Sequence, residues 1–132
     1  MLLTVTTYQS LIDMTREYVI QHIAEIYSTE AEYPFASSPD CAVFRHHNNK
    51  KWFAIMMTVS KDKLGLTSTE NIDIINVKSD PILIGNLMGE DGFYPAYHMN
   101  KTHWITIALD GSADDEKLKF LLDLSFDLTS KK

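Results

Sequence analysis

The sequence predicts an α+β fold in which an antiparallel sheet has helices packed on one of its faces. Two amphipathic segments, near residues 15–28 and 114–130, flank a central region that is rich in β-forming residues. Helices and strands do not alternate regularly along the chain, which argues against a doubly wound parallel sheet. A length of 132 residues fits one domain and leaves little room for a second.

A stripe of apolar side chains at helical spacing predicts the first long helix, which we expect to end near Ser28. The stripe consists of Val19, Ile23, Ile26 and Tyr27. Thr15 precedes it and is a candidate N-cap. A similar apolar pattern in residues 7–13 predicts one or two further helical turns upstream.

The central region begins with a predicted β-hairpin. Residues 41–46 and 52–59 are rich in β-branched and aromatic side chains. Between them lies a polar turn, whose tip we expect near Asn48 and Asn49. Residues 72–77 have the same β-forming character and predict a third strand.

A further strand is predicted at residues 103–109, after a loop or irregular strand at residues 90–101. Successive side chains of a strand point to opposite faces of the sheet. The aliphatic side chains expected to face the helices are Ile105, Ile107 and Leu109. Trp104 then lies on the opposite face, where its ring is available for stacking.

A short helix is predicted between these strands by the residues at its two ends. Asp80 is a candidate N-cap, and Pro81 occupies the first helical position. Gly89 follows the last apolar residues of the segment and marks the end of the helix. This order of proline at the start and glycine at the end is typical of a helix.

The last helix is predicted to run from about residue 114 to residue 130. Ser112, followed three residues later by Asp115, resembles a capping box in which the usual glutamate is replaced by aspartate. The apolar periodicity predicts which side chains this helix buries. They are Leu118, Leu121, Leu122, Ser125 and Leu128.

Charge is unevenly distributed along the chain. The formal net charge is −6, which excludes a strongly basic nucleic-acid-binding protein but not a local basic face. Residues 41–104 contain seven lysine and arginine residues against six acidic residues, together with four of the five histidines. This segment is either a set of ordinary solvated loops or a face for an anionic ligand.

Residues 94–104 combine aromatic side chains, two histidines, an asparagine and a lysine. This combination can stack on a base or a sugar and hydrogen-bond to a phosphate. It is also compatible with an edge of the core in which Tyr97 and Trp104 are simply packed. The candidate DNA-binding or anion-binding residues of the central segment are Arg45, Lys50, Lys51, Lys78, His98, Lys101, His103 and Trp104.

The sequence contains no recognisable catalytic or metal-binding motif. His98 and His103 lack the spacing of common zinc ligands, and the adjacent His46 and His47 point to opposite faces of a strand. Cys41 lies among apolar strand residues, which is typical of an inert buried thiol. We therefore expect no enzymatic activity, no metal and no cofactor.

The compartment is suggested by what the sequence lacks. A single cysteine excludes an intramolecular disulfide framework. The first residues show neither the basic nor the apolar region of an export signal, and no stretch approaches the ~18 apolar residues of a membrane span. We expect a cytoplasmic protein that does not enter a membrane.

Four segments resemble the MmcQ/YjbR family of small bacterial proteins. They are Tyr-Pro-Phe at 33–35, Asn-Val-Lys-Ser-Asp-Pro at 76–81, Pro-Ala-Tyr-His-Met-Asn-Lys-Thr-His-Trp at 95–104 and Ser-Phe-Asp-Leu at 125–128. The resemblance covers residues 14–132 as a single domain and leaves residues 1–13 as an N-terminal extension. It implies a fold similar to that of the CyaY/frataxin-like domains.

Members of this family are commonly labelled DNA-binding proteins, and the resemblance implies no catalytic role. The family-motif positions present in this chain are Lys78, His98, Lys101, His103 and Trp104. The leading hypothesis is a non-enzymatic protein that binds an anionic partner, such as DNA held weakly, through its sheet and hairpin.

Two alternatives remain open at this point. One is a protein-interaction or regulatory adaptor that makes its contacts through acidic helices, and the other is a binder of a small phosphorylated ligand or a metal. Cations on one contiguous face would favour DNA, whereas cations scattered among acids would favour the adaptor. A concave pocket around His98 and Trp104 would favour a small ligand.

Overall fold

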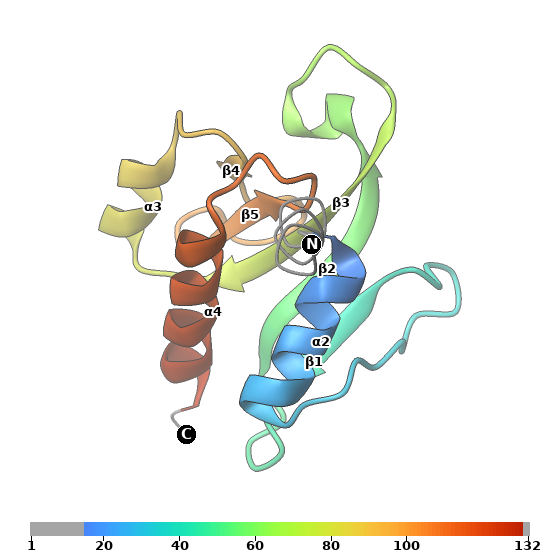
Figure 1. The fold of residues 1–132 in the computed structure, drawn as a ribbon, viewed down its shortest axis with the longest axis vertical. Coiled ribbons are helices and arrows are strands. Elements are labelled where there is room, and N and C mark those ends of the chain that lie inside the picture. The colour runs from blue at the N-terminus through green and yellow to red at the C-terminus, as the bar shows by residue number, and fades with distance from the viewer. Residues whose placement is uncertain (1–14, 131–132) are drawn as a thin grey trace, which may run out of the picture.

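A computed structural model describes residues 15–130 of the chain (Figure 1). The N-terminal extension predicted at residues 1–13, including the helical turns expected at residues 7–13, lies outside the described residues. The elements in chain order are α2 (Arg16–Tyr27), β1 (Ala42–Arg45), β2 (Trp52–Ser60), the 3₁₀ helix η1 (Lys61–Leu64), β3 (Asn71–Lys78), α3 (Pro81–Leu87), β4 (Phe93–Pro95), β5 (Trp104–Ala108) and α4 (Asp115–Thr129).

The strands form a five-stranded sheet with the order β1-β2-β3-β5-β4. Every neighbouring pair is antiparallel, which confirms the predicted fold class. The hairpin predicted at residues 41–59 is β1–β2, and its turn contains Lys50 in a left-handed conformation with φ 64°. The region expected to be a loop or irregular strand contains β4 and a loop over residues 96–103.

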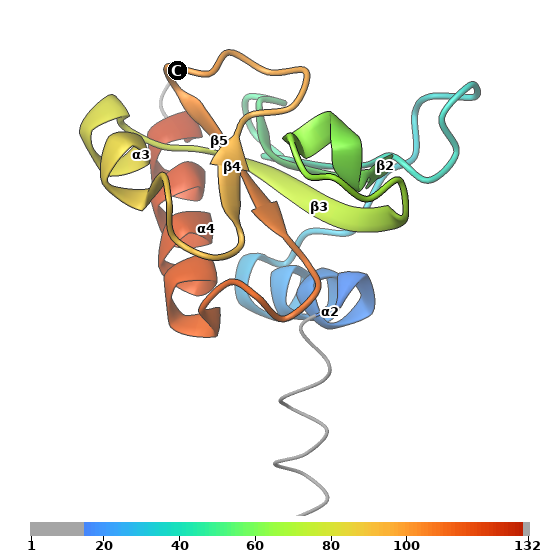
Figure 2. The same cartoon turned by 90° about the horizontal axis from the view of Figure 1, so that it is seen from above.

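Helices α2 and α4 lie side by side on one face of the sheet (Figures 1 and 2). Their apolar side chains and those of the sheet form the main core, and α3 contributes Ile84 and Leu87 at one end. The core includes Ile105, Ile107 and Leu109, so the predicted inward side of β5 is confirmed. Within residues 15–130, three α-helices and one sheet therefore make an α+β domain whose main hydrophobic layer lies between them.

Two residues predicted to be buried are exposed. Ile26 is 59% exposed, because α2 turns this side chain to solvent while Tyr27 stacks on Phe126 of α4 with a ring separation of 4.8 Å. Leu128 is 38% exposed, and Thr129 is buried in its place. A polar residue is required there because the Thr129 hydroxyl lies 2.8 Å from the buried ring of His46.

The helix starts were predicted with one error. Thr15 and Asp80 are the N-caps of α2 and α3, as expected. The predicted capping box at Ser112 is wrong: the N-cap of α4 is Asp114, whose carboxylate accepts the Lys117 N–H at 3.0 Å. The hydroxyl of Ser112 instead bonds to Asp110 within the preceding turn.

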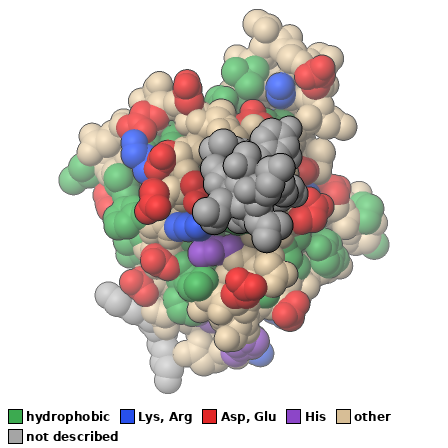
Figure 3. Space-filling view, viewed as in Figure 1, with side chains coloured by type: hydrophobic (Ala, Val, Ile, Leu, Met, Phe, Trp, Pro, Cys, Tyr) green, Lys and Arg blue, Asp and Glu red, His purple; other side chains and the backbone are tan. Residues whose placement is uncertain are grey.

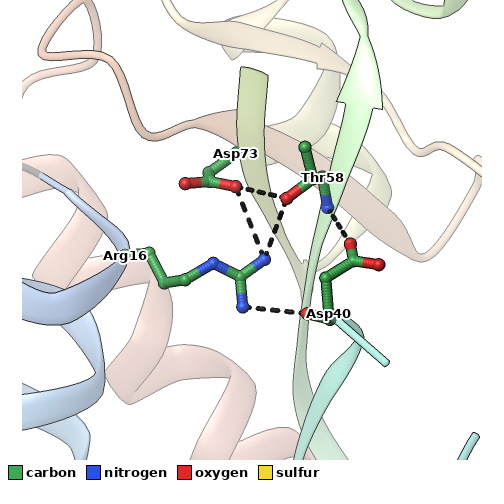
Figure 4. Close-up of polar contacts among 4 residues, drawn as sticks. All are labelled: Arg16, Asp40, Thr58 and Asp73. Atoms are coloured by element: carbon green, nitrogen blue, oxygen red, sulfur yellow. Dashed lines mark hydrogen bonds and ion pairs between the residues drawn. The ribbon is translucent and has the colours of Figure 1, made fainter. Parts of the chain in front are cut away.

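A polar cluster joins the start of α2 to the sheet (Figure 4). The Arg16 guanidinium reaches Asp73 of β3 at 3.4 Å, the Thr58 hydroxyl at 3.3 Å and the backbone oxygen of Asp40 at 2.9 Å. The Thr58 N–H donates to the Asp40 carboxylate at 2.8 Å. One arginine thus holds α2, two strands and the segment before β1 in a fixed relation.

Substitution of Gly92 tests the close contact between the residue before β4 and Ala113, which precedes α4. The φ of Gly92 is +89°, and a Cβ at this position would lie 2.5 Å from the backbone nitrogen of Ala113. We expect Gly92→Ala to lower the free energy of unfolding by about 2–5 kcal/mol, because it combines backbone strain with overpacking. Chemical denaturation measures this loss.

Gly85 supplies the matched control. It lies within α3, and a Cβ there would meet nothing within 4 Å. Gly85→Ala should therefore raise the free energy of unfolding by about 0.5–1 kcal/mol. Equal effects of the two substitutions would contradict the packing described here.

Candidate functional site

The sheet face opposite α2 and α4, called the outer face here, is covered by loops and the short 3₁₀ helix η1 and by no α-helix of the described residues. Figure 2 shows η1 and the 96–103 loop on this side. A small apolar cluster of Cys41, Val43 and Ile55 lies on it, and Trp52 and Trp104 pack against that cluster. The prediction that Trp104 lies on the face away from the helices is therefore confirmed.

Strand register places cations and tryptophans together at one end of the outer face. The Cα of Arg45 pairs with that of Trp52 across β1 and β2, and the Cα of Lys78 pairs with that of Trp104 across β3 and β5. Lys78 follows Asn76 by two residues in β3 and so shares its face. The four residues Arg45, Trp52, Lys78 and Trp104 form what we call the cation–tryptophan row.

The β1–β2 turn extends this end of the sheet. Lys50 and Lys51 lie in it and are exposed. The Asn49 side chain donates to the backbone oxygen of Thr129 at 2.9 Å, which holds the turn against the end of α4. His103 is also near this end, because its backbone oxygen accepts the N–H of Ser79 just after β3.

The other two candidate residues lie in the 96–103 loop. His98 is exposed, has a left-handed φ of 59° and stacks on Tyr97 with a ring separation of 4.0 Å. Lys101 donates from its Nζ to the backbone oxygen of Ala96 at 2.7 Å. These two side chains are held by their own loop and are not members of the cation–tryptophan row.

Buried polar side chains hold this loop on the outer face. Asn76 and Thr106 are both fully buried neighbours on β3 and β5, and the Thr106 hydroxyl donates to the Asn76 side chain. The Tyr97 N–H donates to the Thr106 oxygen at 2.9 Å, and the Asn76 amide donates to the Tyr97 oxygen at 3.0 Å. The backbone of Tyr97 is therefore fixed while its ring remains half-exposed.

Three of the hollows that the described residues form lie along the outer face and share aromatic walls. The first, of about 140 Å³, includes Arg45, Trp52 and Phe35. The second, of about 340 Å³, extends from Phe35 to Tyr97 and His98. The third, of about 240 Å³, contains Tyr97, Lys63 and Lys101. Phe35 is thus shared with a hollow that contains Arg45, and Tyr97 with a hollow that contains two lysines, whereas the charged side chain of the central hollow is Asp40.

Acidic residues limit the positive charge of this face. The Arg45 guanidinium pairs with the Glu32 carboxylate at 2.7 Å, and Asp40 lines the central hollow. Hydrogen bonding from the Thr58 N–H holds the pKa of Asp40 below its usual value, so this carboxylate stays ionised near neutral pH. Figure 3 shows further acidic side chains scattered over the opposite face, which α2 and α4 form.

The histidines do not converge on a metal. Burial lowers the pKa of His46, which contacts Thr129, whereas His47 is exposed and contacts the backbone of Ser28. Within residues 15–130, no group of three or more metal-ligating side chains could hold an ion. Cys41 is buried, and burial together with the nearby Asp40 raises the pKa of its thiol.

Four outer-face residues were not among the predicted candidates: Phe35, Trp52, Lys63 and Tyr97. Trp52 could have been found from the hairpin, because it lies directly after the turn and opposite Arg45. Phe35 and Tyr97 lie in two of the segments that resemble the family, at 33–35 and 95–104, and could have been found from that resemblance. Lys63 carries no such signal, since the path of its segment over the sheet depends on tertiary contacts.

The architecture defines a class of small α+β proteins with an antiparallel sheet that has helices on one face and an open, loop-lined surface on the other. The chain belongs to the YjbR family, whose model matches residues 24–128. None of the helices within the described residues has the length and apolar character needed to cross a membrane.

Relatives of known sequence and structure agree with this assignment. YyaQ of Bacillus subtilis is 39% identical over 116 residues, which cover 88% of this chain and 98% of YyaQ. YjbR of Escherichia coli K12 is 32% identical over 82 residues, which cover 61% of this chain and 68% of YjbR. A crystal structure from Pseudomonas syringae has a TM-score of 0.84 at 40% identity and covers 87% of this chain and 98% of its own.

Cys41 provides a test of how closed the central hollow is. Its side chain lines this hollow, yet the residue is only 7% exposed and its thiol has a raised pKa. We expect slow alkylation by iodoacetamide at neutral pH, with an apparent pKa above the ~8.5 of an unperturbed thiol. Mass spectrometry measures the rate, with the urea-unfolded chain as control. Equal rates in the folded and unfolded chain would contradict the burial.

Proposed function

We propose that this chain is a non-catalytic binding protein that holds DNA weakly and without sequence preference on its outer face. The cation–tryptophan row is the single observation that carries the proposal. It places two cationic and two aromatic side chains in alternation across four neighbouring strands. Cations neutralise phosphates and aromatic rings stack on bases, so the row combines the two contacts that such binding needs.

The order of the strands keeps the two tryptophans of the row apart, and packing limits their freedom. Neighbouring strands of a sheet lie about 4.8 Å apart, so Trp52 on β2 and Trp104 on β5 are separated by roughly 10 Å. Both rings are half-buried and pack against the same apolar cluster, which limits their freedom before a ligand arrives. Lys50 and Lys51 in the adjacent turn add cations at the same end of the sheet.

Charge explains why the affinity should be low. Arg45 is already paired with Glu32, and the chain as a whole carries a net charge of −6. Few counterions are released when only about four cations meet phosphates, so electrostatics contributes little to the affinity. A cytoplasmic location, expected from the sequence, would give the protein access to DNA.

A second candidate function is supported by the helix face. Ile26 and Phe120 are 59% and 58% exposed on α2 and α4, among the acidic side chains of that face. Exposed apolar side chains surrounded by charged residues are typical of protein-interaction surfaces. This observation favours an adaptor that uses its acidic helices, and absence of DNA binding would make it the leading candidate.

Salt dependence tests the role of the cations. With contacts from Arg45, Lys50, Lys51 and Lys78, a log–log plot of the duplex binding constant against salt should have a slope of roughly −3 to −4. The double substitution Lys50→Ala/Lys51→Ala should weaken binding equally for all sequences and reduce this slope by about 2. Fluorescence anisotropy at several salt concentrations measures both quantities.

The matched control for the lysine substitutions is Lys117→Ala/Lys119→Ala on α4. These lysines pair with acids on the helix side of the molecule, away from the outer face. The slope should not change in this variant. If wild-type protein binds neither duplex nor single-stranded DNA at low salt, the DNA proposal is wrong.

Trp104 tests the stacking contact. Trp104→Ala should weaken binding of single-stranded DNA by about 1–3 kcal/mol and affect duplex much less, because stacking needs an unpaired base. Trp104→Phe keeps a ring and should retain part of the affinity. Phe120→Ala, an exposed ring on α4, is the control, and thermal melts establish that each variant is folded. An equal loss for single strands and duplex would argue against stacking.

A further inference from the structure

The central hollow of the outer face combines aromatic walls with an apolar floor and a polar rim. Phe35, which also lines the hollow of Arg45, and Tyr97, which also lines the hollow of Lys63 and Lys101, are its aromatic residues. Its apolar lining comes from Met57 and Val59 of β2 and from Cys41, directly before β1. Its polar lining comes from Ser37, Ser38, Asp40, Thr58 and His98. A volume of about 340 Å³ is at the small end of the range for ligand pockets, so one planar ring system with little attached fits best.

Asp40 is the charged group of this hollow, and its position is well fixed. Its carboxylate accepts the Thr58 N–H at 2.8 Å through Oδ2, and its backbone oxygen accepts the Arg16 guanidinium at 2.9 Å (Figure 4). A carboxylate has about four acceptor sites, so capacity remains after the Thr58 bond. Because its pKa is lowered, Asp40 accepts hydrogen bonds and does not donate them near neutral pH.

Among the residues that the structure describes, no lysine or arginine lines the central hollow, but cations line the two hollows that share Phe35 and Tyr97 with it. Arg45 lies beyond Phe35, and Lys63 and Lys101 lie beyond Tyr97. A bound strand would therefore meet cations, then an aromatic slot whose charged group is the Asp40 carboxylate, then cations again. This order matches phosphate, base and phosphate along a nucleotide chain.

We propose that the central hollow binds a single nucleobase between Phe35 and Tyr97, and that Asp40 makes guanine the preferred base and thymine the least favoured. The proposal rests on the DNA-binding function proposed above and changes it in one respect: strand binding by the cation–tryptophan row has no sequence preference, whereas the single base in the central hollow is selected. Guanine presents two neighbouring N–H donors, N1–H and the N2 amino group, toward a carboxylate. Thymine presents one N–H that lies between two carbonyl oxygens, and the negative carboxylate oxygens repel these carbonyl oxygens.

Protection of Cys41 measures occupancy of the hollow directly. It is the only cysteine of the chain and lines this hollow, so a bound base should slow its alkylation. We expect deoxyguanosine monophosphate to protect the thiol at concentrations about tenfold lower than deoxythymidine monophosphate, which is the effect of one hydrogen bond to a charged group. Alkylation in mildly alkaline buffer, followed by mass spectrometry, gives both protection curves.

Asp40→Asn distinguishes base recognition from a structural role of Asp40. The amide keeps an oxygen for the Thr58 N–H but replaces carboxylate acceptors with an N–H donor. The difference between the two nucleotides should fall to less than about twofold in this variant, while its melting temperature stays close to that of the wild type. Phe35→Ala should weaken protection by both nucleotides, and Phe120→Ala on the helix face should change neither.

The outcomes separate the base site from the DNA-binding function. Protection that is absent, or equal for the two nucleotides, overturns the base site even if oligonucleotides bind to the cation–tryptophan row. Selective protection by the guanine nucleotide together with no oligonucleotide binding at low salt supports the base site and overturns the strand-binding function. Selective protection that persists unchanged in Asp40→Asn overturns the role assigned to that carboxylate.

Discussion

A buried polar pair holds together the surface on which the proposed functions depend. Asn76 and Thr106 lie side by side on β3 and β5 with no exposed surface, and between them they bind both the N–H and the carbonyl of Tyr97. A buried polar group lowers stability unless it is hydrogen-bonded. The buried polar groups of the two strands and of the loop form hydrogen bonds with one another, which fixes the position of the loop on the sheet. Because Tyr97 lines two of the three hollows, their shape depends on this pair.

The two faces of the sheet are covered to different extents. On the inner face, α2 and α4 supply large apolar side chains and close a continuous core. On the outer face, the described residues supply loops, the short helix η1 and single aromatic rings, and these leave a hollow lined by Phe35, Tyr97 and strand residues. An antiparallel sheet tolerates one incompletely covered face, since alternate residues can be polar or half-exposed there. The open outer face thus follows from the placement of α2 and α4, the two long helices of residues 15–130, on the inner face.

The candidate site was partly predictable because strand alternation is a local property. The sheet face on which Trp104 lies followed from the alternation of the aliphatic residues Ile105, Ile107 and Leu109 in the strand predicted at 103–109. The hairpin followed from its turn residues. The pairing of Lys78 with Trp104 could not be predicted, because the register between β3 and β5 joins residues that are 26 positions apart in the chain. Lys101 was expected with the other cations, but its contact with Ala96 assigns it to a different hollow.

The sequence by itself determined the fold class, the caps of α2 and α3 and the inward face of β5, because periodicity and capping act over a few residues. Only the tertiary structure decided that Thr129 and not Leu128 is buried. The Thr129 hydroxyl contacts the ring of His46, which lies in the β-hairpin 83 positions earlier in the chain. The tertiary structure also brought Phe35, Cys41 and Tyr97 around one hollow. Contacts between distant segments decide such arrangements, and no local pattern encodes which segments will meet.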